Sequence, residues 1–199
     1  MKKAFTLLEL VFVIVIAGIL AFVLIPKSSD TKLLESANQL ISHIRYAQQL
    51  ALNNDQFDPN DKDWYKKMWR IEFENNGTYK VWRGNEAQSN KIAPDPANPG
   101  QKLKDVQLKR GIVAKGSNVI FDELGRVYSE QATNKSYENK IDTNTTIRLC
   151  KGSANSSSNA CDSKERIELI IQAETGYILP RHCGAANKDG VSTCKVLDI

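Results

Sequence analysis

Histidine is scarce in this chain, since His43 and His182 are its only two histidines among 199 residues. Histidine is the commonest general base and a frequent metal ligand, so its scarcity removes many catalytic and metal constellations. Neither histidine has a nucleophile or a second ligand at the spacing of a known motif. We therefore expect no enzyme activity, no catalytic residue and no cofactor.

The sequence also lacks complete signals for a zinc site, a calcium site and a nucleic-acid-binding surface. The cysteines do not form the two close C-x₂₋₄-C pairs that zinc sites use. Residues 58–63 are rich in aspartate, but a calcium loop needs glycine at its sixth position and glutamate at its twelfth, where Trp69 stands. A strong basic excess is also lacking, because 27 Lys and Arg residues stand against 23 Asp and Glu residues. We expect no metal site, and a nucleic-acid partner is not favoured.

The N-terminus carries the strongest positive signal. Lys2 and Lys3 precede a mostly apolar run, residues 5–25. As a helix, this run is about 30 Å long, which is the thickness of a bilayer core. It is too long for the apolar region of a secretory signal, and no A-x-A cleavage site follows it. Glu9 interrupts the run at a cost of a few kcal/mol in a membrane, so we interpret this carboxylate as functional.

Residues 3–9, Lys-Ala-Phe-Thr-Leu-Leu-Glu, resemble the class III signal of type IV pilins and type II secretion pseudopilins. The resemblance implies that a prepilin peptidase cuts between Ala4 and Phe5, removes the leader 1–4 and N-methylates Phe5. It also implies that Glu9 pairs with the amino group of Phe5 in a neighbouring subunit. Ala4 departs from the family, in which the residue before the cut is usually glycine. Pro26 falls where these helices commonly carry a kinking proline.

We expect one long helical spine that begins at Phe5. Its first half, 5–25, is predicted to cross the bacterial inner membrane once, because Lys2 and Lys3 hold the N-terminus on the cytoplasmic side. Its second half, 26–54, is predicted to pack on a periplasmic head, 55–199, before the subunit enters a periplasmic filament. The resemblance implies as partners other pseudopilins or pilins through the N-terminal helix, prepilin peptidase, the inner-membrane assembly platform and membrane lipid.

The pattern of apolar residues changes period along the chain. In the second half of the spine, apolar residues recur every three or four positions and so share one helical face. They are Leu33, Ala37, Leu40, Ile41, Ile44, Ala47 and Ala51. From residue 69 the period is two, and residues 69–82 predict a β-hairpin around Asn75-Asn76-Gly77. Further strands are expected at 106–109, 117–121, 126–129, 146–150, 166–173 and 177–179. A helix followed only by strands predicts an α+β fold with an antiparallel sheet.

The cysteines indicate an oxidising compartment. Cys150 and Cys161 are separated by ten residues, and so are Cys183 and Cys194. Four cysteines allow three pairings. The equal spacing favours two local disulfides, Cys150–Cys161 and Cys183–Cys194, while the crossed pairings stay open. Each local loop would contribute up to about 3 kcal/mol of stability in the chain-entropy model.

Two segments of the head carry a second resemblance. Residues 121–126 and 167–178 look like the sheet signatures of H-type minor pseudopilins and FimT-like minor pilins. We therefore expect a structural function, as a minor pseudopilin in the periplasmic pseudopilus of a type II secretion system. One alternative is a minor type IV pilin that serves fibre initiation, adhesion or DNA uptake. Another is a non-polymerising, membrane-anchored periplasmic binding protein, against which Glu9 argues.

Overall fold

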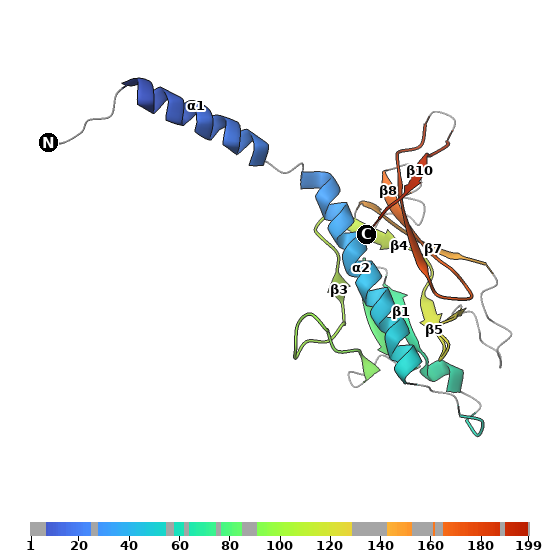
Figure 1. Ribbon diagram of the computed structural model, residues 1–199. Coiled ribbons are helices and arrows are strands. Elements are labelled where there is room, and N and C mark those ends of the chain that lie inside the picture. The colour runs from blue at the N-terminus through green and yellow to red at the C-terminus, as the bar shows by residue number, and fades with distance from the viewer. Residues whose placement is uncertain are drawn as a thin grey trace.

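The computed structural model describes residues 7–24, 28–54, 58–61, 64–74, 77–84, 91–128, 143–152, 161, 165–187 and 190–198. The described chain begins with two helices, α1 (Leu7–Leu24) and α2 (Ser28–Asn53). A short 3₁₀ turn, η1 (Trp64–Lys67), follows, and all later elements are β-strands (Figure 1). Figure 1 shows α2 lying against the strands, whereas α1 stands apart from them.

The predicted long helical spine is wrong. In place of one continuous helix, the described chain has α1 with 18 residues and α2 with 26 residues. The interval between them contains Pro26. A proline inside a helix removes a backbone donor and clashes with the preceding turn, which explains why a continuous helix is unfavourable here. The predicted kink at Pro26 itself lies outside the described residues.

The predicted membrane crossing by residues 5–25 is also wrong. Within the described part of the chain, no helix combines the length and the apolarity that a membrane crossing demands. At about 1.5 Å per residue, α1 is about 27 Å long, which is shorter than a bilayer core of about 30 Å. Its first turn also contains Glu9. The prediction of a single-pass protein in the inner membrane is wrong for the same reason.

The head contains two sheets rather than the one that the sequence predicts. In the described residues each sheet has five strands, and every pairing is antiparallel. The first sheet has the order β3-β2-β1-β5-β6, with β1 (Trp69–Phe73), β2 (Thr78–Arg83), β3 (Val106–Gln107), β5 (Val119–Phe121) and β6 (Val127–Tyr128). The second has the order β10-β9-β8-β7-β4, with β4 (Ile112–Lys115), β7 (Thr145–Lys151), β8 (Arg166–Ile171), β9 (Ile178–Cys183) and β10 (Cys194–Val196).

The predicted hairpin at 69–82 is confirmed. Strands β1 and β2 pair antiparallel, with Trp69 opposite Arg83 and Phe73 opposite Tyr79. Asn75 and Asn76 lie outside the described residues, but Gly77 has a φ of 83°. Such a backbone conformation favours glycine, so Gly77 explains why the chain can reverse at this point.

Helix α2 supplies one side of the core for both sheets. The seven apolar residues predicted to share its buried face are all 4% exposed or less. They contact β1, β2 and β5 of the first sheet and β4, β7 and β8 of the second. The two sheets are therefore assembled around one amphipathic helix, as the helical period of these residues indicates.

A glutamine near the end of α2 forms hydrogen bonds to one turn of each sheet. Gln48 Nε2 donates hydrogen bonds to the carbonyl oxygen of Gly125 at 3.0 Å and to that of Thr175 at 2.9 Å. Gly125 lies in the turn before β6, and Thr175 lies in the turn between β8 and β9. Gly176 has a φ of 63°, and a Cβ there would collide with Gln48 and with the Gly125 carbonyl. Glycine is thus required where the three segments meet.

Candidate functional site

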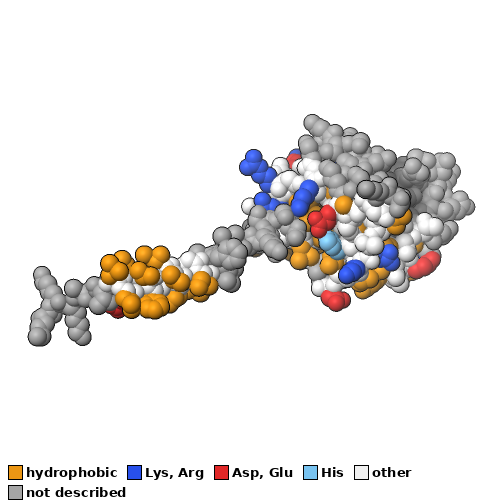
Figure 2. Space-filling view, turned by 90° about the horizontal axis from the view of Figure 1, so that it is seen from above, with side chains coloured by type: hydrophobic (Ala, Val, Ile, Leu, Met, Phe, Trp, Pro, Cys, Tyr) orange, Lys and Arg blue, Asp and Glu red, His pale blue; other side chains and the backbone are white. Residues whose placement is uncertain are grey.

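The surface of α1 is the first candidate site. Residues 10–16 are seven successive apolar residues, and successive helical residues are rotated by about 100°, so they cover every side of the helix. The large apolar side chains described in residues 7–20 are between 51% and 82% exposed. Figure 2 shows apolar side chains along the visible face of α1, beyond the head. This helix presents an apolar surface that the described head does not cover.

Glu9 places one negative charge at the N-terminal end of this apolar surface. It lies in the first turn of α1 and is exposed. A carboxylate near a helix N-terminus is stabilised by the partial positive charge of that end. Ala4 and Phe5, which carry the predicted cleavage, N-methylation and charge pair, lie outside the described residues, so these predictions stay predictions.

Two disulfides reinforce the edges of the second sheet. Cys150 is bonded to Cys161, and Cys183 is bonded to Cys194. The first bridge ties β7 to the segment before β8, and it packs against Val113 of β4 in a buried cluster. The second joins residues that are directly opposite each other on β9 and β10. These are the two local pairs that the equal cysteine spacing favours.

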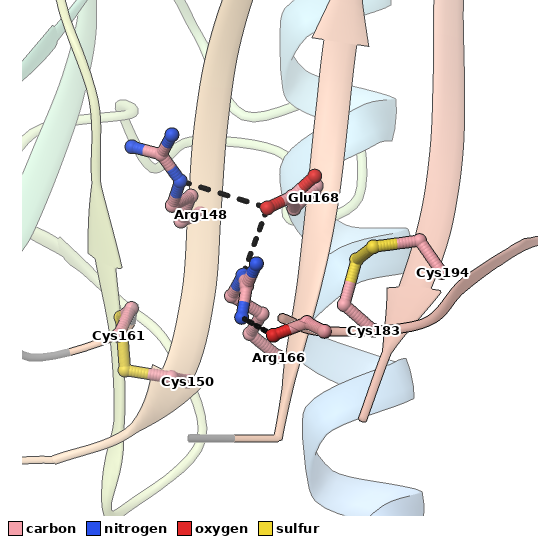
Figure 3. A network of polar contacts seen from close by, with 8 residues as sticks. Arg148, Cys150, Cys161, Arg166, Glu168, Cys183 and Cys194 are labelled. Carbon is pink, nitrogen blue, oxygen red and sulfur yellow. Dashed lines mark hydrogen bonds and ion pairs between the residues drawn. A yellow bond between two sulfur atoms is a disulfide. The ribbon is translucent and has the colours of Figure 1, made fainter. Parts of the chain in front are cut away.

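A charged network lies on the second sheet between the two disulfides, with α2 behind the strands (Figure 3). Arg166 Nε donates to Glu168 Oε1 at 2.8 Å, and Arg148 Nε lies 3.6 Å from the same oxygen. Arg166 Nη1 also donates to Ser192 Oγ at 3.1 Å. This network was not predicted from the sequence, although Arg166 and Glu168 are two positions apart on a predicted strand and so share a face.

Glu168, Cys183 and Cys194 bring one carboxylate and two sulfurs within 4.8 Å of one another. Both sulfurs belong to the same disulfide. A metal binds cysteine as a thiolate, which an oxidised cysteine does not supply. This cluster therefore does not form a metal site in the disulfide-bonded protein.

The two histidines lie in separate places. His43 is buried on α2, and its Nδ1 lies 2.8 Å from the hydroxyl of Tyr79. His182 is on β9, and its Nε2 lies 3.0 Å from Glu165 Oε1. The structure thus does not combine them into one site.

His43 and Tyr79 are both held in their neutral forms. Burial lowers the pKa of His43 and outweighs the opposite effect of the Asp95 carboxylate. Burial also raises the pKa of the Tyr79 hydroxyl, whose oxygen accepts a weak hydrogen bond from Gln39 Nε2 at 3.4 Å. His43 Nδ1 and the Tyr79 hydroxyl share one hydrogen bond, and the tautomer of the neutral imidazole decides which of the two groups donates. This pair fastens α2 to β2.

Comparison with known proteins finds no family model, no curated protein and no solved structure that matches this chain.

Proposed function

We propose that this protein is a minor pseudopilin, a structural subunit of the filament of a type II protein secretion system. The observation that carries the proposal is the apolar helix α1: its described side chains, in residues 7–20, are all exposed, and the helix stands apart from the strands in Figure 1. The proposed partners are the N-terminal helices of neighbouring pseudopilins. The head remains on the outside of the filament.

The energetics of α1 support an assembly function. Burial of one large apolar side chain stabilises an assembly by about 1.5–3 kcal/mol. The described part of α1 has many such side chains, including Leu7 at 82% exposed and Ile14 at 62% exposed. An exposed apolar surface of this extent favours association. A bundle of similar helices covers it on every side.

Glu9 supplies what apolar packing alone lacks, which is a defined register between neighbours. When the helices bundle, its carboxylate leaves bulk water, and an unpaired charge there is costly. The resemblance at residues 3–9 implies that the amino group of Phe5 in an adjacent subunit is its partner. A charge pair at one end of the helix fixes the axial position of each subunit.

The head fits a filament that works in an oxidising compartment. Cys150–Cys161 and Cys183–Cys194 close two loops of the second sheet. Disulfides persist in such compartments and are rare in the cytosol.

Substitution of Glu9 tests the proposal. Glu9→Leu makes α1 more apolar but removes the carboxylate that sets the register. Breaking a buried ion pair costs about 3–5 kcal/mol, so we expect the variant to lose co-purification with partner pseudopilins and to lose secretion. Glu9→Asp keeps the charge and should retain part of both activities.

Two results would contradict the proposal. One is a Glu9→Leu variant that co-purifies and supports secretion as well as the wild-type protein does. The other is a deletion strain that secretes normally but lacks surface pili, since this outcome identifies a minor type IV pilin instead.

A further inference from the structure

The two disulfides close loops of equal length but lie in different surroundings. Each joins two cysteines with a sequence separation of 11. In the chain-entropy model the stabilisation by a disulfide depends on the length of the loop that it closes, so this contribution is the same for both. A difference in reactivity between the two disulfides must therefore come from what surrounds their sulfur atoms.

The disulfide Cys150–Cys161 is enclosed by the head. Both cysteines are 0% exposed, and they pack with Val113 of β4 in one buried cluster. Cys150 lies on β7, which has β8 on one side and β4 on the other. A thiolate dissolved in water therefore has no access to either sulfur atom while the head is folded.

The disulfide Cys183–Cys194 lies at the edge of the second sheet. Cys183 is 0% exposed on β9, whereas Cys194 is exposed on β10. Within the described chain, β10 is an edge strand that pairs with β9 alone, and all of its residues are exposed. An attacking thiolate can therefore approach this disulfide from the side of Cys194.

We propose that Cys183–Cys194 is a site of thiol–disulfide exchange, at which an external thiolate attacks Cys194. The attacking sulfur forms a bond to Cys194 Sγ, the bond between the two cysteines breaks, and Cys183 Sγ leaves with the electron pair as a thiolate. If the reactant carries a second thiol, that group attacks the mixed disulfide in turn. The protein disulfide is then reduced by two electrons, and the dithiol is oxidised to its own disulfide. This exchange concerns the head and does not rest on the proposed function.

The charges beside the disulfide restrain the exchange. One carboxylate oxygen of Glu168 and the two sulfur atoms lie within 4.8 Å of one another. Figure 3 shows Glu168 and the disulfide on neighbouring strands. Arg166, which lies opposite Cys183, donates to Glu168 Oε1 at 2.8 Å and to Ser192 Oγ at 3.1 Å. A negative charge this close repels an incoming thiolate and disfavours the thiolate that leaves from Cys183. Glu168 should therefore slow the exchange, and Arg166 offsets part of its effect.

Selective reaction of the folded protein tests the proposal. The oxidised 199-residue chain is incubated without denaturant with reduced glutathione, and in parallel with reduced thioredoxin as a dithiol protein. Free thiols are alkylated at intervals, and the peptides are mapped by mass spectrometry. We expect Cys183 and Cys194 to react at least about tenfold faster than Cys150 and Cys161, because reactivity follows access. The first glutathione adduct should be on Cys194.

The two reagents distinguish the sources of the thiolate. Reaction with glutathione assigns the site to small thiols, and reaction with thioredoxin alone assigns it to dithiol proteins. The proposal is overturned if neither reagent reacts with the folded protein. It is also overturned if the two disulfides react at equal rates, or if the first glutathione adduct is on Cys183.

A charge variant with a matched control tests the surroundings of the sulfurs. Glu168→Gln should speed the reaction of Cys194 with glutathione about threefold, because it removes the negative charge beside both sulfurs. Glu165→Gln removes the same charge from a carboxylate that contacts His182 instead, so its rate should stay within about 1.5-fold of the wild-type rate. The reaction of Cys150 reports unfolding and should not change in either variant. Equal acceleration of Cys150 and Cys194 in Glu168→Gln would show that the head opens as a whole, which contradicts the proposal.

Discussion

Helices α1 and α2 are neighbours in the sequence but differ in what covers them. Seven apolar residues of α2 share one face and are buried against the two sheets, with Ile44 fully buried. Those of α1 occupy every side, and Ile14 is 62% exposed. A one-sided pattern specifies packing inside its own chain, whereas an all-round pattern requires partners from outside. The stability of the head should therefore depend on α2, and assembly should depend on α1.

Shortening one isoleucine in each helix tests this comparison and has the largest expected effect. Ile44→Ala leaves a cavity between α2 and the sheets and should lower the free energy of unfolding of the head by about 2–5 kcal/mol. Ile14→Ala is the matched control in α1 and should change it by less than about 0.5 kcal/mol. Denaturant unfolding monitored by tryptophan fluorescence measures both values. Equal losses in the two variants would show that α1 packs on the head.

A smaller effect is expected from the hydrogen bonds that fasten α2 to the turns. Gln48→Ala removes the donor to Gly125 and Thr175, and the loss should be about 1–2 kcal/mol. Gln49→Ala is the control, because Gln49 is exposed on the same helix turn. The same unfolding experiment applies. A loss below about 0.5 kcal/mol for Gln48→Ala would mean that water replaces both bonds at no cost.

The smallest effect concerns pH. Because burial lowers the pKa of His43 in the folded protein, the unfolded chain binds the proton more readily. Stability should therefore fall as the pH decreases below about 6.5, the pKa of an unperturbed histidine, until the lowered folded pKa is reached. The slope is at most about 1.4 kcal/mol per pH unit for one proton.

Thermal unfolding of the wild-type protein and of His43→Gln between pH 7.5 and pH 5 measures this effect. The variant should show a shallower pH dependence. His182→Gln, which changes the other histidine, serves as the control. The prediction fails if His43→Gln keeps the slope of the wild-type protein.

The sequence predicts correctly those parts of the fold in which the spacing of apolar residues along one segment decides the structure. The buried face of α2 follows from a helical period, and the hairpin of β1 and β2 follows from alternation beside Gly77. Strand β4 was missed because Ile112, Val113 and Ala114 do not alternate. The structure supplies the reason, since the disulfide Cys150–Cys161 covers Val113 on the outer face while the other two residues face the core.

The division into two sheets depends on contacts between distant residues, which no local period reveals. Strand β5 pairs with β1, and β4 pairs with β7, although long segments separate them in the sequence. The spine was wrong for a related reason. The run 5–25 and the pattern after it are both helical, and only their separation into α1 and α2 shows that they do not form one element.

The packing of α2 against both sheets also determines how the head bears mechanical load. A pull on the chain before Ser28 enters the head along α2. Because α2 contacts several strands of both sheets, the tension is divided between the sheets instead of peeling away one edge strand. The bonds from Gln48 lie near the far end of the helix, so they bear load only after the packing nearer its start has begun to slip. A pull on the chain before α2 is therefore transmitted to both sheets through the helix packing before it reaches the bonds of Gln48.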